Sequence, residues 1–413
     1  MKCTLLSIGD ELLIGQTLNT NAHWMSQKMN EIGIDVIHHI SLSDDEKDIV
    51  KCLNDALASS QVVLITGGLG PTSDDITKDV LCAYFGGQLI YNEAAFQNIE
   101  NIYKLRNRAI TDDAKKMSLV PDNCIVIENS TGTAPGMLFR KDEKVIVSMP
   151  GVPYEMKAMI TNSVIPYLQE NFQLPTIIHK SILTVGIGET ILAENLKDFE
   201  QTKDKRIKLA YLPSVGKVRL RLTIKGENKE ELKAVIDKAT EIVVQANQEH
   251  IYGFDDDVFE EKIGELLLEK KLTIGTAESC TGGYIAHLIT SVAGSSAYFK
   301  GSIVSYANEV KEGLLHVKEE TLAQFGAVSE QTVSEMLSGA LEQLKTDIII
   351  AVSGVAGPSG GTPEKPVGTV FIGIANKEKQ YIKKLSFTNN RERNIQLSAI
   401  VSLVMLRKFL LNL

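Results

Sequence analysis

Short apolar runs and amphipathic stretches alternate along roughly the first 170 residues. Nearly continuous apolar runs predict buried strands at residues 4–9, 34–40 and 61–66. Apolar residues at helical spacing predict helices at residues 21–31, 44–58 and 76–86. This order predicts a doubly wound α/β domain over residues 1–170, with ligands at the C-terminal ends of its strands.

The pattern changes over residues 174–252. Residues 181–188 are strand-like, and residues 208–226 predict two strands around a Pro-Ser-Val-Gly turn. Residues 189–201 predict one amphipathic helix, and residues 228–248 a long, highly charged one. We expect a small α+β module here.

The last third, residues 255–413, returns to the α/β pattern. It begins with a predicted helix at residues 258–271 and a strand at 272–278, followed by the start of another helix. Further strands are predicted at residues 347–354 and 368–375, and a final helix runs from residue 391 to the end. We therefore expect a third domain with its own α/β architecture.

The composition narrows the classes of protein. The 413 residues are 44% hydrophobic and 23% charged, which suits two or three globular domains and excludes a mainly disordered chain. The formal net charge of −9 provides no general attraction for DNA or anionic membranes. A bound phosphate would therefore have to be held by local groups.

The cysteines and the apolar segments indicate in which cellular compartment the protein is expected. The five cysteines include no C-x-x-C pair, so neither a zinc framework nor a disulfide scaffold is indicated. Asp10 and Glu11 interrupt the first apolar run before it reaches signal-peptide length, and the run at residues 399–406 is too short to span a bilayer. We expect a cytoplasmic location and no membrane partner.

Glycines and acids follow two predicted strands of the first domain. Gly9-Asp10-Glu11 ends the first strand, and residues 67–75 (GGLGPTSDD) follow the third. Both strand ends open on one edge of the sheet, where glycine loops let backbone N–H groups approach phosphate. Acids there suit a divalent cation, although taken alone Asp74 is typical of a helix cap and the glycines of a turn.

These motifs carry a family resemblance. GDELL, NTNA, GGLGPTSDD, GTAPG and MPGVPYEM, in this order, resemble the N-terminal domain of the competence/damage-inducible CinA family over about residues 1–170. The resemblance implies a molybdopterin-binding-like fold. It also implies metal-dependent cleavage of ADP-ribose or a related nucleoside diphosphate, and pterin binding is the alternative function that the fold would allow. It implies Mg²⁺ or a similar divalent metal at Asp74 and Asp75. The substrate-binding residues expected in this domain are Gly9, Asp10, Glu11, Asn21, Gly67, Gly68, Gly70, Thr72, Thr133, Gly136, Pro150, Gly151 and Glu155.

Ser279 marks a second candidate site, where a predicted strand joins a helix. Backbone N–H groups there can form an oxyanion hole, although a plain helix cap is the alternative. Its hydroxyl needs a base, which Lys311 could supply with Tyr306 as a proton relay. By themselves these two residues are typical of a solvated lysine and a packing tyrosine, and Cys280 is either a rival nucleophile or a small buried filler.

A second glycine loop, residues 353–362, follows the strand at residues 347–354 and could bind phosphate through its backbone. Arg391 stands at the start of the last helix, where it could pair with a phosphate, and Arg393 is close by. A flexible connection and a solvated arginine are the alternatives.

The segments TAESCTGG, SIVSYANEVK, GAVSE, SGVAGPSGG and EKPVGTV resemble the C-terminal CinA domain over about residues 255–413. Standalone versions are nicotinamide-nucleotide amidohydrolases, so the resemblance implies hydrolysis of nicotinamide mononucleotide to nicotinic acid mononucleotide and ammonia without a cofactor. By motif, Ser279 is the nucleophile and Tyr306 and Lys311 are its proton-transfer partners. The expected substrate-binding residues are Thr281, Gly282, Gly283, Asn308, Ser353, Gly357, Gly360 and Arg391.

The middle module resembles the family's KH-like segment. It has no evident G-x-x-G loop with flanking basic residues, so we do not expect direct nucleic-acid binding. We expect this module to space the domains or to assemble the protein into a homo-oligomer, namely a dimer. The alternative functions are a partner protein in competence or DNA repair, and a pterin-binding scaffold with one active domain.

Overall fold

The computed structural model describes residues 1–105 and 107–412. The chain divides into two compact units, one of Met1–Ile178 with Lys225–Leu232 and one of His179–Ile224 with Lys233–Leu413.

The N-terminal domain is built on a six-stranded sheet of order β2-β1-β3-β8-β7-β6. Its parallel strands are β2 (Asp35–Leu42), β1 (Lys2–Ile8), β3 (Val62–Thr66) and β8 (Lys144–Met149), and its antiparallel strands are β7 (Gly136–Lys141) and β6 (Ile125–Ile127). The central strand β3 is buried throughout, because helices cover both faces of the sheet. The predicted alternation of strands and helices is confirmed.

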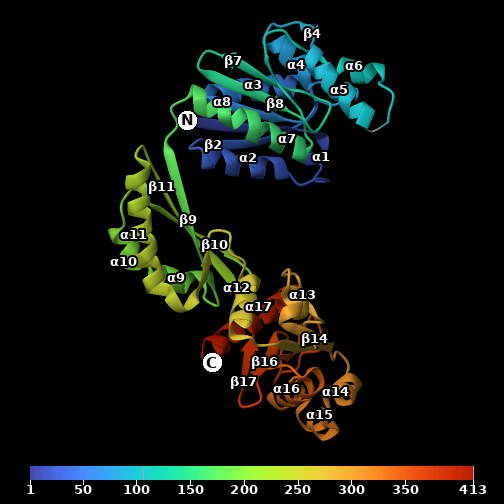
Figure 1. Ribbon diagram of the computed structural model, residues 1–413, viewed down its shortest axis with the longest axis vertical. Helices are drawn as coiled ribbons and strands as arrows, with labels where there is room; N and C mark the ends of the chain where they lie inside the picture. The colour runs from blue at the N-terminus through green and yellow to red at the C-terminus, as the bar shows by residue number, and fades with distance from the viewer. Residues whose placement is uncertain (106, 413) are drawn as a thin grey trace. The chain divides into compact units, whose positions relative to one another are not determined.

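Two sets of helices cover this sheet (Figure 1). One face carries α2 (Thr20–Glu31), α7 (Pro153–Met159) and α8 (Ile165–Asn171), with a π-helical turn at Ile160–Val164; the other carries α3 (Glu46–Ser59), α4 (Thr77–Tyr84) and α5 (Glu93–Leu105). Side-chain caps start two of them: Asn19 accepts from the N–H of Ala22, and Asp45 from that of Lys47. Short elements complete the domain: α1 (Asp10–Leu13), α6 (Asp112–Lys116), β4 (Leu89–Tyr91) and β5 (Leu119–Pro121).

The middle module has a four-stranded sheet of order β10-β11-β9-β12. Its elements are β9 (Thr176–Val185), α9 (Glu189–Asn195), α10 (Lys197–Thr202), β10 (Lys208–Ser214), β11 (Lys217–Gly226), α11 (Lys229–Asn247), a 3-10 turn (Gln248–His250) and β12 (Ile251–Phe254). The alternating sequence of β11 buries every second side chain, as the pattern predicts. The single helix predicted at residues 189–201 is wrong, because the backbone of Leu196 leaves helical geometry and divides it into α9 and α10.

The C-terminal domain has a five-stranded sheet of order β14-β13-β15-β16-β17. Three strands are parallel, namely β13 (Ile274–Glu278), β14 (Phe299–Val304) and β15 (Ile348–Gly354); β16 (Thr369–Ala375) and β17 (Gln380–Ser386) are antiparallel. Parallel pairing brings the ends of β13 and β14 to one edge, with Glu278 opposite Val304. The candidate site lies at this edge.

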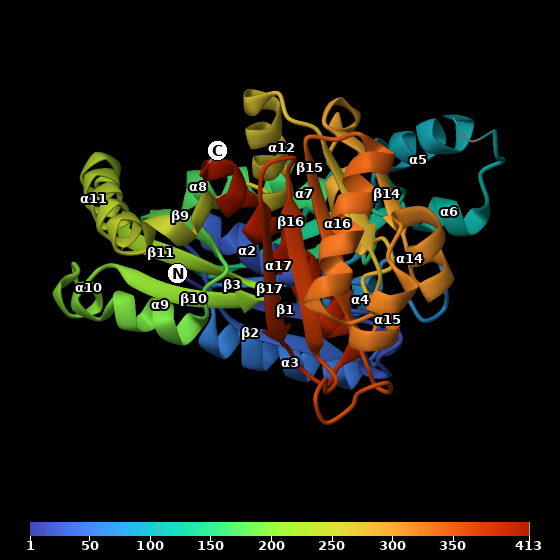
Figure 2. The same cartoon turned by 90° about the horizontal axis from the view of Figure 1, so that it is seen from below.

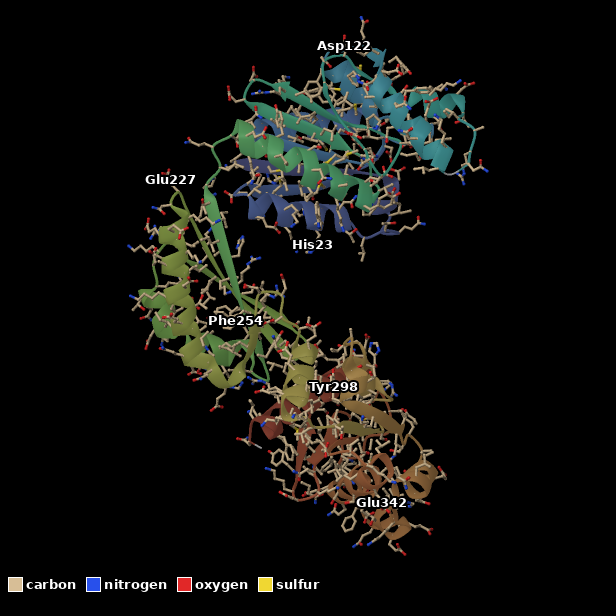
Figure 3. All side chains as sticks on the ribbon, viewed as in Figure 1. His23, Asp122, Glu227, Phe254, Tyr298 and Glu342 are labelled. Atoms are coloured by element: carbon tan, nitrogen blue, oxygen red, sulfur yellow. The ribbon has the colours of Figure 1, made fainter. Side chains whose placement is uncertain are left out.

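Helices lie on both faces of the C-terminal sheet (Figure 2). They are α12 (Phe259–Lys270), α13 (Tyr284–Thr290), α14 (Asn308–Leu315), α15 (Glu319–Phe325), α16 (Glu330–Leu344) and α17 (Arg391–Leu411), with a 3-10 turn at Ser295–Ala297. One core includes α12, α13 and α17, and another includes α14 and α16. Tyr298, labelled in Figure 3, packs in the first core against Gly264 of α12.

The last helix bears on the expectation that no segment spans a membrane. The apolar stretch at residues 399–406 was expected to be too short for a membrane, but α17 is 21 residues long and, by length and composition alone, is apolar enough to cross one. Half of its apolar window is buried inside the protein. It contacts α12, α13, β15 and β16, which is the packing of a core helix.

Candidate active site

Ser279 and Lys311 meet at the C-terminal edge of the parallel strands. Ser279 directly follows β13, and Lys311 lies on α14, which begins four residues after β14 ends. The Nζ of Lys311 lies 3.1 Å from the Oγ of Ser279. Ser279 is 8% exposed and Lys311 only 1%. The structure therefore brings together the predicted nucleophile and its predicted base.

The surroundings of Lys311 favour its neutral form. Nζ donates to the backbone oxygens of Ser305 at 2.7 Å and Tyr306 at 3.2 Å. In the part of the chain that the structure describes, no carboxylate forms an ion pair with it. Burial lowers the pKa of Lys311, opposed by a smaller effect from the Cys280 thiol. Two carbonyls take two N–H groups of a neutral amine, which leaves its lone pair for the hydroxyl of Ser279.

A cavity of about 200 Å³ opens beside this pair. Its lining combines polar groups with small apolar side chains: Ser279, Cys280, Tyr306, Lys311, Ala327, Val328, Ser353, Gly354, Ala356 and Arg391. Ala327 and Val328, in the GAVSE segment, were not predicted as site residues. The available signal was that GAVSE is one of the segments that carry the family resemblance, because small apolar residues by themselves are common everywhere.

Tyr306 and Arg391 contact each other in the lining of the cavity. Nη2 of Arg391 donates to the Tyr306 hydroxyl at 3.1 Å, and Nη1 donates to the backbone oxygen of Gly357 at 2.8 Å. The Tyr306 side chain is 60% exposed, and the structure does not hydrogen-bond its hydroxyl to Ser279 or Lys311. Its role as a proton relay stays a prediction. Arg393 instead lines a separate cleft with the β10–β11 turn.

Cys280 lines the same cavity but is poorly suited to be a nucleophile. It is 6% exposed, and burial raises the pKa of its thiol to about 12. The thiol is therefore protonated at neutral pH. Of the two adjacent candidates, the geometry favours Ser279.

The remaining predicted residues of this domain lie at different distances from the pair. Gly282 and Gly283, both with positive φ, form the turn that leads into α13, together with the buried Thr281. Ser353 lines the cavity and donates to the backbone oxygen of Ala327 at 2.7 Å. Asn308, Gly357 and Gly360 are not among the cavity-lining residues.

The predicted glycine loops of the N-terminal domain do converge on one sheet edge. The N–H of Gly67 donates to Met149 O at the end of β8, and a Cβ on Gly67 would collide with the Ile8 backbone at the end of β1. Since Gly67 also has a positive φ of 109°, only glycine fits there readily. Gly68 and Gly9 likewise have positive φ at this edge.

Acidic side chains gather at the same edge. The N–H of Asp10 donates to a carboxylate oxygen of Asp44 at 3.3 Å. Desolvation raises the pKa of Asp44, and the negative charges of Asp10, Glu11 and Asp74 raise it further. Asp44 was not among the predicted site residues, because its place before a helix is equally typical of a cap.

The second predicted metal ligand, Asp75, has a local partner. Its carboxylate accepts from the N–H of Thr72 at 2.9 Å and from the Thr72 hydroxyl, and it lies over Gly70. Among the residues that the structure describes, no group of three or more His, Cys, Asp or Glu side chains is arranged to hold a metal ion. A metal here would need phosphate oxygens as further ligands, which is usual for Mg²⁺.

Asn21 ties α2 to the loop after β8. Its amide nitrogen donates to Gly151 O at 2.7 Å and lies 3.4 Å from the Thr66 hydroxyl, which in turn donates to Pro150 O. The amide oxygen of Asn21 is buried without a partner in the described chain. Asn21, Pro150 and Gly151 therefore lie at the predicted edge.

Glu155 is buried, and its carboxylate is hydrogen-bonded to another side chain of the same domain. It accepts from the Asn129 amide at 2.7 Å and lies against Gly132, where a Cβ would collide with its carboxylate. Asn129 in turn accepts from the N–H of Gly132. This network shapes the loop before Gly136.

Thr133, another predicted substrate-binding residue, lies in a cleft of about 370 Å³ between α5 and β6.

Together, these features define a chain that joins a molybdopterin-binding-like α/β domain, a KH-like module and an α/β domain with a buried serine–lysine pair. Residues 4–170 match the family model of the probable molybdopterin binding domain, residues 179–253 the damage-inducible protein CinA KH domain, and residues 256–410 the CinA C-terminal domain. The predicted fold class is confirmed.

The chain belongs to the CinA family. It is 46% identical to a CinA-like protein of Flavobacterium psychrophilum, over 100% of this chain and 99% of that protein. It is 45% identical to a CinA-like protein of Cytophaga hutchinsonii, over 98% and 97%. A solved structure, competence/damage inducible protein CihA from Agrobacterium tumefaciens, is 35% identical over 37% of this chain and 96% of that chain, with a TM-score of 0.35.

Proposed function

We propose that the C-terminal domain hydrolyses the carboxamide of nicotinamide mononucleotide, producing nicotinic acid mononucleotide and ammonia. The contact between Lys311 and Ser279 supports this proposal most directly. A buried lysine with a lowered pKa and no ion-pair partner in the described chain is the base that a serine nucleophile requires.

The reaction proceeds by acyl transfer. Neutral Lys311 accepts the Ser279 proton as Oγ attacks the carboxamide carbon, and backbone N–H groups stabilise the oxyanion. The C–N bond breaks and the leaving nitrogen takes the proton from Lys311, so ammonia departs and an acyl-serine remains. Water then attacks the acyl carbon, gives a proton to Lys311, and releases the carboxylic acid as Oγ recovers that proton.

Arg391 and the neighbouring loop hold the nucleotide phosphate in this proposal. Arg391 lines the cavity and is already oriented by the Gly357 carbonyl. A guanidinium can bind phosphate through two parallel hydrogen bonds. The phosphate would thereby place the carboxamide at Ser279.

The test is ammonia release from nicotinamide mononucleotide by the purified chain. Ser279→Ala should abolish it, whereas Ser291→Ala, which removes an exposed serine just after α13, should leave it unchanged. Full activity of Ser279→Ala would refute the nucleophile, and no ammonia from the wild-type chain would refute the substrate.

We further propose that the N-terminal domain cleaves ADP-ribose or a related nucleoside diphosphate with a divalent metal. The observation behind this is the acidic cluster formed by Asp10, Glu11, Asp44 and Asp74 beside the glycine loops. One or two of these carboxylates, with phosphate oxygens, would hold Mg²⁺. When bound, the metal would neutralise phosphate charge and polarise phosphorus.

This second activity has an independent test. ADP-ribose and Mg²⁺ should yield AMP and ribose phosphate, and chelation should stop the reaction. Asp74→Asn should reduce it, while Ser279→Ala should not, because Ser279 belongs to the other domain. Undiminished cleavage by Asp74→Asn would remove Asp74 from the metal site.

A further inference from the structure

The carboxylate of Glu278 spans the turn that carries Ser279. Glu278 is the last residue of β13 and is completely buried. It accepts hydrogen bonds from the N–H groups of Gly283 at 3.0 Å, Ile285 at 3.0 Å and Ala286 at 2.8 Å. The hydroxyls of Thr276 and Ser302 lie 3.1 and 3.5 Å from the carboxylate and 2.7 Å from each other, so one of them donates to Glu278 and the other donates to its neighbouring hydroxyl. The side chain thus clamps the start of α13 to the end of β13.

The clamp occupies donors that would otherwise attract an anion. Unsatisfied N–H groups at a helix start are a ready site for negative charge, and here a fixed carboxylate fills it. An oxyanion formed at Ser279 therefore cannot use the N–H groups of Gly283, Ile285 or Ala286.

Two backbone N–H groups of this segment have no acceptor on another residue of the described chain. The other N–H groups have acceptors within the chain: Ser279 donates to Val352 O, Gly282 to Ser279 O, Tyr284 to Thr281 O and His287 to Gly283 O. Within the described chain, neither the N–H of Cys280 nor that of Thr281 donates to another residue. Both residues are more than 90% buried, and buried N–H groups without a partner are rare in proteins.

A third donor without a partner lies on the same turn. The Thr281 hydroxyl is buried and has no hydrogen-bond partner in the described chain. Three donors without acceptors on the two residues that follow the nucleophile indicate a site for an acceptor supplied by a ligand. The N–H of Gly282, one of the predicted substrate-binding residues, instead donates to Ser279 O.

We infer that Glu278 is a positioning residue for acyl transfer: it holds the turn so that the N–H groups of Cys280 and Thr281 form the oxyanion hole. This role rests on the proposed serine chemistry of the C-terminal domain. A carboxylate is required because it only accepts, so three N–H groups and a hydroxyl can converge on it. Glutamine would present an NH₂ group to some of these donors and loosen the turn.

The negative charge of Glu278 also bears on the neighbouring thiol. It adds to the effect of burial in raising the pKa of Cys280, so the residue beside the nucleophile stays a neutral thiol. Burial is the main cause of this raised pKa, and the Glu278 charge acts in the same direction.

The experiment compares Glu278→Gln with a matched change at the other end of β13. The carboxylate of Asp347 accepts from the N–H of Thr273 at 2.8 Å and from its hydroxyl at 2.6 Å, away from the cavity. Glu278→Gln should lower kcat for nicotinamide mononucleotide about 100-fold, with KM within about twofold, because only transition-state donors are displaced. Asp347→Asn should lower the melting temperature but leave kcat within about twofold. An equal fall in kcat in both variants, or a change in KM alone for Glu278→Gln, would overturn the inference.

A more conservative substitution tests the same role if the Glu278→Gln protein does not fold. Thr276→Val removes the hydroxyl that lies 3.1 Å from the carboxylate and 2.7 Å from the Ser302 hydroxyl, and it keeps the shape of the side chain. The loss of one hydrogen bond of about 1 kcal/mol should lower kcat about fivefold with KM unchanged. An unchanged kcat in a folded Thr276→Val protein would count against Glu278.

A fluorophosphonate probe separates this inference from the proposed substrate. Ser279 Oγ attacks phosphorus and displaces fluoride, and the negative charge that develops on the phosphoryl oxygen during this step needs the same hole. The rate of labelling Ser279, followed by peptide mass spectrometry, therefore needs no nucleotide. If the wild type is labelled but releases no ammonia, the proposed substrate fails, and slower labelling of Glu278→Gln still supports the role of Glu278. Equal labelling rates in the two proteins would refute that role whatever the substrate.

Discussion

The Nζ of Lys311 lies 3.1 Å from the Oγ of Ser279, although the two residues are 32 positions apart in the sequence. Parallel pairing of β13 with β14 brings the turn after β13 beside the start of α14. The same packing buries the lysine and lowers its pKa. The position of one side chain therefore sets both the geometry and the protonation of the candidate base.

Removing the amine should abolish base catalysis. Lys311→Met should reduce ammonia release by roughly 10²–10⁴-fold, the usual contribution of a general base. Lys311→Arg should be equally inactive, because a guanidinium stays protonated. Lys300→Met, which removes an exposed lysine on β14, is the control and should keep full activity. Activity in Lys311→Arg close to that of the wild type would rule out a role as base.

The lowered pKa of Lys311 predicts a pH dependence of activity. Because the amine must be neutral, kcat/KM should rise with pH as Lys311 loses its proton. The midpoint should lie below the ordinary lysine value of about 10.4, because burial disfavours the ammonium form. The measurement is kcat/KM for nicotinamide mononucleotide across the stable pH range. A rise centred at or above the ordinary value would contradict the assignment.

The lowered pKa of Lys311 also predicts how the free energy of unfolding changes with pH. The unfolded chain binds the Lys311 proton more tightly than the folded chain, so folding gains stability as pH rises from the lowered pKa toward about 10.4. The difference in free energy of unfolding, wild type minus Lys311→Met, should therefore increase with pH, by at most about 1.4 kcal/mol per pH unit. Urea unfolding at several pH values measures it, and a difference that falls with pH would be the wrong sign.

Arg391 and Arg393 should differ sharply in function. Arg391 lines the cavity beside Ser279, whereas Arg393 lines a separate cleft. Arg391→Met should raise KM for nicotinamide mononucleotide roughly 10- to 100-fold, the worth of a charged hydrogen bond, and change turnover of the phosphate-free riboside little. Arg393→Met is the matched control and should behave as the wild type. Equal losses on both substrates would exclude phosphate binding by Arg391.

The acidic cluster predicts metal-dependent stability of the N-terminal domain. Mg²⁺ should raise the melting temperature of its thermal transition, since a ligand that binds only the folded state stabilises it. Asp44→Asn should weaken this shift, because it removes one carboxylate from the cluster. Asp55→Asn, an exposed acid on α3, should not. Identical shifts in all three proteins, followed by scanning calorimetry, would argue against Asp44 as part of the metal site.

Much of the secondary structure was predictable because burial on one or both faces leaves a period in the sequence. The strands β1, β3 and β13 and the helices α2, α11 and α12 match their predicted ranges closely. The edge strand β17 was not predicted, because most of its side chains are exposed and it has no strict alternation. The break at Leu196 was also missed, since helical periodicity continues across it.

By itself, the sequence determined the fold class, the family motifs, and the place of Ser279 between a strand and a helix. Those properties depend on local pattern and order along the chain. Only the tertiary structure decided which groups meet: Lys311 beside Ser279, Glu278 on the start of α13, and Asp44 near Asp74. Each pairing joins separate elements, and each pKa shift follows from burial, so both appear only once the chain has packed.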